Sequence, residues 1–130
     1  AEFNRVLTLN LLAQQALIAA FDGLLRASDA GRVVVLTSSV GQKPRAYWGA
    51  YGSTKAAFDN ILNSYAQEVE KISNIRVAIV DPGATRTDMR AKAYPGEDPQ
   101  TVKPPEDVAE HLLSLLQRDF STAHRERIES

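Results

Sequence analysis

The sequence predicts an α/β fold in which helices pack on a parallel β-sheet. Two short runs rich in β-branched residues, 32–37 and 75–80, lack polar alternation, which is typical of strands buried on both faces. A long helical pattern precedes each run, over residues 2–26 and 50–71. Because the order is helix, strand, helix, strand, we expect the two strands to run parallel in one sheet.

The first predicted helix carries apolar residues on two stripes rather than one. We therefore expect other parts of the protein to cover it on more than one side. Turn-forming residues at 28–31, Ser-Asp-Ala-Gly, end the helix. The stripes consist of Val6, Leu9, Ala13, Ala16, Ala20 and Leu24, and of Leu7, Leu11, Ile18 and Leu25.

The second predicted helix follows a turn-rich stretch, residues 38–49. Residues 81–105 contain five prolines and show no hydrophobic periodicity, so a long functional loop or lid is predicted there. A last helix is expected over residues 106–117. The polar tail after it holds a short candidate strand at residues 127–129.

Two strands are too few for an independently stable sheet, which normally has three or more. The chain also begins without methionine. We interpret Ala1 as a boundary inside a longer protein. On this interpretation, residues 1–130 are the C-terminal part of a single doubly wound domain, and the N-terminal half precedes them.

Composition excludes several classes of protein and of site. Fifteen Lys and Arg residues against 16 Asp and Glu give a net charge of -1, which argues against nucleic acid as a partner. The absence of cysteine excludes disulfides, thiolate metal sites and cysteine nucleophiles, and is compatible with a cytoplasmic location. No uninterrupted apolar run approaches the ~20 residues of a membrane-spanning helix, so no membrane partner is expected.

Tyr51 and Lys55 lie four residues apart on the second predicted helix and therefore project from one face. A free phenol has a pKa near 10 and is a poor base at neutral pH. An ammonium group about 4 Å away is expected to lower that pKa by about three units, at an effective dielectric constant of about 20. The pair is therefore a candidate general acid/base, although the spacing alone also arises by chance.

Ser38 directly follows the first predicted strand, at the carboxyl end, where open parallel sheets place their ligands. A hydroxyl there is suited to donate a hydrogen bond to a substrate carbonyl as negative charge develops on its oxygen. The alternative is that Thr37, Ser38 and Ser39 only satisfy backbone groups of a turn.

Three motifs agree in order, spacing and strand context. They are Thr-Ser-Ser-Val-Gly at 37–41, Tyr-Gly-Ser-Thr-Lys at 51–55 and Asp-Pro-Gly-Ala-Thr-Arg-Thr at 81–87. The set resembles the short-chain dehydrogenase/reductase family. The asparagine-containing helix of that family is similar to residues 6–11, so the resemblance covers nearly the whole chain, from Phe3 to about Phe120.

The resemblance implies a Rossmann-type, doubly wound parallel sheet, of which this chain represents only the C-terminal half. Three further stretches are similar to a bacterial subgroup of the family, the YciK-like oxidoreductases. These stretches are residues 48–51, 85–89 and 95–99.

The resemblance also implies NAD(P)-dependent carbonyl reduction or alcohol oxidation. Tyr51 would be the general acid/base at the substrate oxygen, and Lys55 would lower its pKa and hold the nicotinamide ribose. Ser38 would bind and polarise the carbonyl group. Asn10 would shape its helix so that a water molecule links Lys55 to solvent. Taken alone, Asn10 is a helix-interior amide satisfied by backbone.

The implied cofactor is NAD or NADP. Thr87 would hydrogen-bond the nicotinamide carboxamide or a phosphate, whereas the structural alternative for its segment is a loop turn plus a helix cap. The glycine-rich turn that holds the pyrophosphate in this family has no match in residues 1–130, so this stretch alone is not expected to be catalytically competent. The residues implied in cofactor binding are Tyr51, Lys55, Pro82, Gly83, Thr85 and Thr87.

The implied partner is a small carbonyl or alcohol substrate, and a homodimer or homotetramer is expected to form through the two long helices. A dehydratase or epimerase of the same family would use the same tyrosine and lysine. The alternative of another class is a non-catalytic fragment or degenerate member that serves as a helix-mediated association module, with Ala13, Ala20, Ala56 and Ala57 facing outward. The joint presence of all four catalytic residues favours the enzyme.

The remaining polar residues near the end of the chain are interpreted as solvated. His111 and His124 are 13 positions apart without a carboxylate cluster, so no metal site is expected. The basic residues Arg118, Arg125 and Arg127 alternate with acidic ones, as in a solvated tail.

Two aromatic residues precede Tyr51. Tyr47 and Trp48 would either line a substrate pocket or pack in the turn. The sequence supports both interpretations equally.

Overall fold

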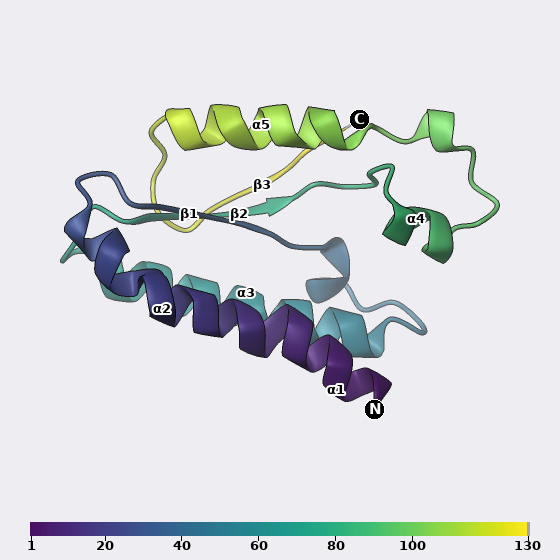
Figure 1. The fold of residues 1–130 in the computed structure, drawn as a ribbon, viewed down its shortest axis with the longest axis horizontal. Helices are drawn as coiled ribbons and strands as arrows, with labels where there is room; N and C mark the ends of the chain where they lie inside the picture. Colours follow the sequence, from purple (N-terminus) through teal and green to yellow (C-terminus); the bar gives the residue numbers. More distant parts are fainter. Residues whose placement is uncertain (130) are drawn as a thin grey trace.

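A parallel three-stranded sheet lies between two layers of helices in the computed structural model, which describes residues 1–129. The strands β1 (Arg32–Leu36), β2 (Arg76–Asp81) and β3 (His124–Arg127) pair in the order β1-β2-β3. Helices α2 (Ala13–Ala27) and α3 (Gly49–Glu70) cover one face, and α5 (Pro105–Gln117) covers the other (Figure 1). The predicted α/β class and parallel pairing are therefore confirmed.

The first long helix changes its winding near its start. α1 (Glu2–Leu7) continues into a π-helical segment, Thr8–Leu12, and then into α2. Leu11, Ile18 and Leu25 pack on the core below α3. None of residues 2–27 is buried, so the described residues do not supply the expected cover on more than one side, and that expectation stays a prediction for the complete protein. Only the stripe that faces α3 is covered.

The same helix meets a length and composition criterion for crossing a membrane. Within residues 2–27 an 18-residue window reaches a mean hydropathy of 1.3, although no long uninterrupted apolar run occurs there. The expectation of no such segment relied on uninterrupted runs. It differs from this result because leucine, alanine and isoleucine are spread along the whole helix.

β2 is the buried centre of the sheet and β1 lies at its edge. Val77, Ala78, Ile79 and Val80 of β2 are at most 1% exposed, whereas Leu36 of β1 is 43% exposed. The prediction of a strand buried on both faces is confirmed for β2. β1 matches it in part, since Val33 and Val35 pack on one core and Val34 on the other, but the strand is only half-buried because it has a neighbouring strand on one side only among the described residues.

Alternate residues of β2 enter two different cores. Val77 and Ile79 pack on the α3 side, whereas Ala78 and Val80 pack on the α5 side. Each fully buried aliphatic side chain contributes about 1.5–3 kcal/mol. Both faces of the strand must therefore be apolar, which is why the sequence shows no polar alternation there.

The predicted loop over residues 81–105 contains two short elements. They are α4 (Asp88–Ala93) and a 3-10 turn, Pro99–Thr101. The Thr87 hydroxyl caps α4 by accepting a hydrogen bond from the Arg90 backbone N–H at 3.1 Å, and Asp98 caps the 3-10 turn in the same way. Elements this short are fixed by their caps rather than by apolar periodicity.

The tail carries ion pairs that join it to α3, α5 and β2. Its strand covers His124–Arg127 rather than residues 127–129. The Glu126 carboxylate contacts His111 of α5 at 2.6 Å, and His124 and Arg118 at 3.0 Å each. The solvated interpretation holds in part, since the Arg118 and Arg127 side chains are about half exposed. It missed the ion pairs, because parallel pairing with β2 brings Glu126 beneath α5.

Candidate active site

Ser38, Tyr51 and Lys55 come together where β1 ends and α3 begins. Ser38 follows the strand and caps a 3-10 turn, Ser39–Gly41, that packs on α3. Tyr51 and Lys55 lie in the first two turns of α3. The three residues therefore lie together at the carboxyl end of the sheet, where open parallel sheets place their ligands.

Two glycines allow the turn after Ser38 to lie directly on α3. A Cβ atom at Gly52 would stand 2.8 Å from the Val40 carbonyl oxygen, and one at Gly41 would stand 3.1 Å from the Lys55 Cβ atom. Any larger side chain at Gly52 would separate the turn from the helix. This close packing fixes the position of Ser38 relative to Tyr51.

Tyr51 is half-buried and its pKa is raised above the usual value for a phenol. Burial is the main cause, a hydrogen bond with Ser38 lowers the pKa, and the charge of Asp81 raises it. Lys55 is not among the causes, and its Nζ atom lies 5.6 Å from the centre of the Tyr51 ring. The predicted lowering of the Tyr51 pKa is therefore wrong for this structure, because burial outweighs the neighbouring charge.

Lys55 is half-buried and carries a weakly engaged ammonium group. Burial lowers its pKa, and the charge of Asp59 offsets part of that effect. Its Nζ atom donates a hydrogen bond to the Leu36 carbonyl at 3.5 Å. Within residues 1–129 it forms no ion pair, so it retains donors for a ligand.

Asn10 lies inside the π-helical segment and reaches across to α3. Its Nδ2 atom donates a hydrogen bond to the Thr54 hydroxyl at 3.3 Å, and Thr54 donates to the Tyr51 carbonyl at 2.7 Å. The interpretation of a side chain satisfied by backbone is therefore wrong. Single π turns inside α-helices occur frequently at functional sites.

Sequence reasoning missed the role of Thr54, which is 1% exposed. Thr54 lies at helical spacing with Phe58, Ile61 and Leu62, and at that spacing a threonine resembles a core residue. Its position three residues after Tyr51, facing the helix that carries Asn10, is visible only in three dimensions.

Asp59 was also missed, and it joins three elements below the site. Its carboxylate accepts a hydrogen bond from the Thr37 hydroxyl at 2.9 Å and one from Arg125 of β3 at 3.2 Å. The available signal was its position four residues after Lys55, which places Tyr51, Lys55 and Asp59 on one face of α3.

The turn after β2 brings Pro82, Gly83 and Thr85 together. Gly83 has φ +68°, and a Cβ atom there would stand 2.9 Å from the Ile128 carbonyl oxygen. The Gly83 backbone N–H donates to Asp81 at 2.9 Å, and the Thr85 hydroxyl donates to the Gly83 carbonyl at 3.2 Å. This turn requires glycine for both conformation and space.

Thr87 lies beyond that turn, at the exposed start of α4. Its hydroxyl oxygen accepts the capping hydrogen bond from Arg90, which matches the alternative of a loop turn plus a helix cap.

Buried Lys103 holds the same turn from the other side. Its Nζ atom donates to the Ala84 carbonyl at 2.8 Å, and its backbone pairs with Thr85 in an isolated parallel bridge. Asp81 forms an ion pair with Arg127 at 2.5 Å. The two cations therefore anchor the Gly83 turn to the rest of the sheet.

Aromatic rings form one side of the site. The Trp48 ring meets the Tyr51 ring edge-on at a centroid distance of 5.8 Å and stacks on the Tyr94 ring at 6.4 Å. Tyr47 is fully exposed. Trp48 is thus placed beside the site, whereas Tyr47 points away from the protein.

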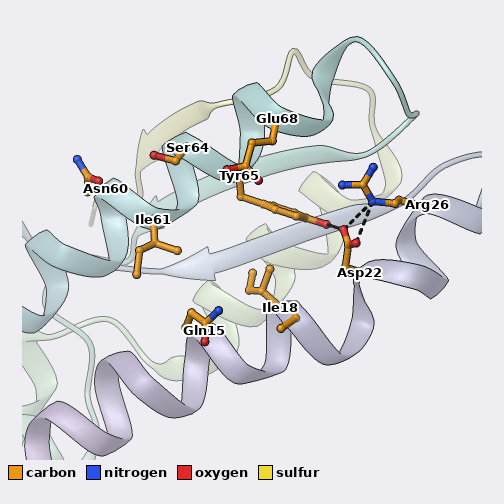
Figure 2. A pocket seen from close by; sticks show the side chains of 10 residues that line it. Gln15, Ile18, Asp22, Arg26, Asn60, Ile61, Ser64, Tyr65 and Glu68 are labelled. Carbon is orange, nitrogen blue, oxygen red and sulfur yellow. Dashed lines mark hydrogen bonds and ion pairs between the residues drawn. The ribbon is translucent and has the colours of Figure 1, made fainter.

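A separate groove runs between α2 and α3, as Figure 2 shows. The Asp22 carboxylate in it accepts a hydrogen bond from Tyr65 at 2.6 Å and two from Arg26 at 2.9 and 3.0 Å. Burial and the hydrogen bond to Asp22 raise the pKa of Tyr65 to about 12. None of the four predicted catalytic residues lines this groove.

Comparison with known proteins identifies the family of this chain. The family model "short chain dehydrogenase" matches residues 1–98. The oxidoreductase YciK of Escherichia coli K12 is 42% identical over 114 residues, which cover 88% of this chain and 44% of that protein. Carbonyl reductase family member 4 of Xenopus laevis is 32% identical, covering 92% of this chain and 52% of that protein.

Solved structures of the same family have the same arrangement. A short chain dehydrogenase of Escherichia coli CFT073, complexed with NADPH, superposes with a TM-score of 0.91 at 38% identity. The match covers 98% of this chain and 53% of that one. The chain therefore spans about half the length of the relatives it matches, and its sheet is part of a Rossmann fold. It belongs to the short chain dehydrogenase family.

Proposed function

We propose that the complete protein is a cytoplasmic enzyme that reduces carbonyl compounds, or oxidises the corresponding alcohols, with NAD or NADP. The observation that carries this proposal is the meeting of Ser38, Tyr51 and Lys55 at the carboxyl end of the sheet. The carbonyl reductase relative and the NADPH-bound neighbour support it.

The residues present fit a nicotinamide cofactor. Lys55 has a half-buried ammonium with free donors, which is suited to ribose hydroxyls. When bound, the cofactor supplies or accepts the hydride. The residues that would hold it are Tyr51, Lys55, Pro82, Gly83, Thr85 and Thr87.

Tyr51 is the proton donor in the proposed reduction. Its raised pKa keeps the phenol protonated at neutral pH, which favours its use as a general acid. The Ser38 hydroxyl donates a hydrogen bond to the same substrate oxygen and stabilises its developing negative charge. Lys55 adds positive charge near this oxygen without lowering the ground-state pKa of Tyr51.

Asn10 acts through Thr54 and not on the substrate. Its hydrogen bond to Thr54, and that of Thr54 to the Tyr51 carbonyl, hold the first turn of α3 against the π-helical segment. We assign Asn10 a positioning role, with a water molecule at the opened helix turn as the route for proton exchange to Lys55.

Replacement of Tyr51 by phenylalanine in the complete protein tests the proposal. NADPH oxidation with a panel of aldehydes and ketones should fall by about 10²–10⁴-fold, while NADPH binding is retained. The exposed residue Tyr47 supplies the matched control, Tyr47→Phe, which should keep the wild-type rate. Full activity in Tyr51→Phe would overturn the proposed role. Absence of net redox turnover in the wild type would favour a dehydratase or epimerase.

We also propose that subunits associate through the two long helices, as a homodimer or homotetramer. The first helix exposes large apolar side chains on the face that α3 does not cover, and Ala13, Ala20 and Ala56 are exposed on the same pair of helices. The exposed apolar residues are Phe3, Leu9, Leu12, Leu17, Phe21 and Leu24. A strictly monomeric complete protein in sedimentation would contradict this proposal.

If the complete protein associates but shows neither cofactor binding nor turnover, the non-catalytic association module becomes the better account. The same sedimentation and NADPH titration experiments distinguish the two.

A further inference from the structure

A row of rings leads from Tyr51 to the segment that follows β2. The Trp48 and Tyr51 rings meet at an interplanar angle of 75°, and the Trp48 and Tyr94 rings are close to parallel at 25°. Trp48 and Tyr51 are adjacent at the start of α3, but Tyr94 comes from the end of α4. Two distant parts of the chain therefore meet on one ring.

Tyr94 is held in this position by two arginines. Arg45 donates a hydrogen bond to its hydroxyl at 2.8 Å, and the Arg90 guanidinium lies over its ring at 3.7 Å. Arg90 is itself paired with Glu97 through hydrogen bonds of 2.9 and 2.7 Å. Glu97 thus neutralises the charge of Arg90, and the side of the row nearest Tyr51 consists of aromatic rings.

The position of the Trp48 ring bears on which carbonyl compounds the Tyr51 hydroxyl protonates. A carbonyl oxygen held by Tyr51 and Ser38 has its carbon substituents a few ångströms from those hydroxyls. The centre of the Trp48 ring lies 5.8 Å from the centre of the Tyr51 ring, so Trp48 is the neighbouring ring on this side. Planar π systems gain more from aromatic neighbours than their buried area alone provides. A saturated ring of the same size lacks this gain.

We propose that Trp48 and Tyr94 form an aromatic wall of the substrate site that selects carbonyl compounds with a planar aromatic group next to the carbonyl. This proposal rests on the proposed function, because it assumes that Tyr51 is the acid that protonates the substrate. Trp48 contacts the substrate, and Tyr94 keeps the Trp48 ring in place by stacking on its other side.

Two aldehydes of matched size test the wall in the complete protein with NADPH. Benzaldehyde and cyclohexanecarboxaldehyde differ in the planarity of their ring. We expect a higher kcat/KM for benzaldehyde, and we expect Trp48→Leu and Tyr94→Leu each to reduce this preference by about threefold to tenfold, as for loss of one aromatic contact. Tyr47→Leu, which removes an exposed ring next to Trp48, should leave the preference unchanged.

Tryptophan emission gives a readout that needs no turnover. Benzamide, which is not reduced, should change the Trp48 emission in the presence of NADPH, whereas cyclohexanecarboxamide should not. Trp48→Phe removes the signal that belongs to this ring and Tyr94→Leu weakens its response. This chain has one tryptophan, and the Trp48→Phe variant corrects for any other.

The outcomes separate the wall from the reaction. Equal kcat/KM for the two aldehydes overturns the proposed wall. The wall is also overturned if neither aldehyde is reduced and benzamide leaves the Trp48 emission unchanged. If Tyr51→Phe nevertheless abolishes reduction of other carbonyl compounds, the proposed function stands without it. If Trp48→Leu and Tyr94→Leu lower activity equally toward both aldehydes, the rings have only a structural role and the wall is again overturned.

Discussion

The Val40 carbonyl oxygen rests against the backbone of α3 at Gly52, where a Cβ atom would stand 2.8 Å away. Real side chains do not tolerate that distance to a backbone atom. Because Val40 lies two residues after Ser38, this contact sets how closely the Ser38 hydroxyl approaches Tyr51.

Gly52→Ala is therefore expected to destabilise the protein and to displace Ser38. Overpacking of this kind costs about 1–3 kcal/mol, which urea unfolding would measure. Gly23→Ala in α2 is the control, since nothing lies within 4 Å of its Cβ position. Alanine there should stabilise the helix by up to about 1 kcal/mol. Equal stability of the two variants would mean that the contact at Gly52 is not tight.

Asp59→Asn should weaken the link among α3, the end of β1 and β3. The amide oxygen can still accept from Thr37, but the ion pair with Arg125 is lost from a largely buried position. We expect a loss of about 1–3 kcal/mol in the free energy of unfolding. Asp119→Asn, whose ion pair with Arg32 is exposed, should change it little. An unchanged free energy of unfolding in Asp59→Asn would show that the buried carboxylate does not stabilise the fold.

Loss of the Asp59 charge should also lower the pKa of Lys55, because that charge raises it in the wild type. Titration of the lysine side-chain resonances by NMR would show the shift. A Lys55 resonance that titrates at the same pH in both proteins would contradict the coupling.

The free energy of unfolding should decrease at acidic pH because Glu126 becomes protonated. Burial raises the pKa of this carboxyl, but hydrogen bonds from His124 and His111 and the charge of Arg118 outweigh burial and bring it to about 2. Since the folded pKa lies below the unfolded value of 4.5, the stabilisation is complete above pH 4.5 and is lost as the pH falls toward 2. Urea midpoints measured between pH 6 and pH 2 would follow it, and Glu126→Gln should have a flatter profile over that range.

Lys103→Met should loosen the turn that contains Gly83. The variant leaves the Ala84 carbonyl without its 2.8 Å hydrogen bond, at a cost of about 1 kcal/mol. The Arg86 amide, which donates to the Lys103 carbonyl, should then exchange its hydrogen about fivefold faster. Lys92→Met on the exposed side of α4 is the matched control. Unchanged exchange at Arg86 would show that the ammonium does not hold the turn.

The periodicity of apolar residues predicted the helices and strands that pack against a hydrophobic core. The helix containing Phe58 and Leu62 and the strand Val77–Val80 bury their apolar residues, so their patterns reflect burial directly. For β1 and for the first helix, composition indicates more burial than residues 1–129 supply. Periodicity also passed over α4, a six-residue helix that starts at the Thr87 cap and has no buried residue.

Spacing predicted the pairing of Tyr51 with Lys55, because i and i+4 residues share a helix face. It gave the wrong sign for the Tyr51 pKa, since burial depends on parts of the chain that spacing does not describe. Thr54, Asp59 and Lys103 act through partners 19 to 66 positions away in sequence, such as Ala84 for Lys103 and Arg125 for Asp59, and no local pattern indicates such pairs.

The π-helical segment at Thr8–Leu12 has a consequence for the length of the chain. A π turn holds one residue more than an α turn, and one residue corresponds to a rotation of about 100° around a helix axis. Asn10 can thus face Thr54 while Leu11, Ile18 and Leu25 still meet the core. Deleting a single residue between positions 8 and 12 would restore an unbroken α-helix and turn one end of it away from α3. The site therefore depends on a count of residues as well as on their identities.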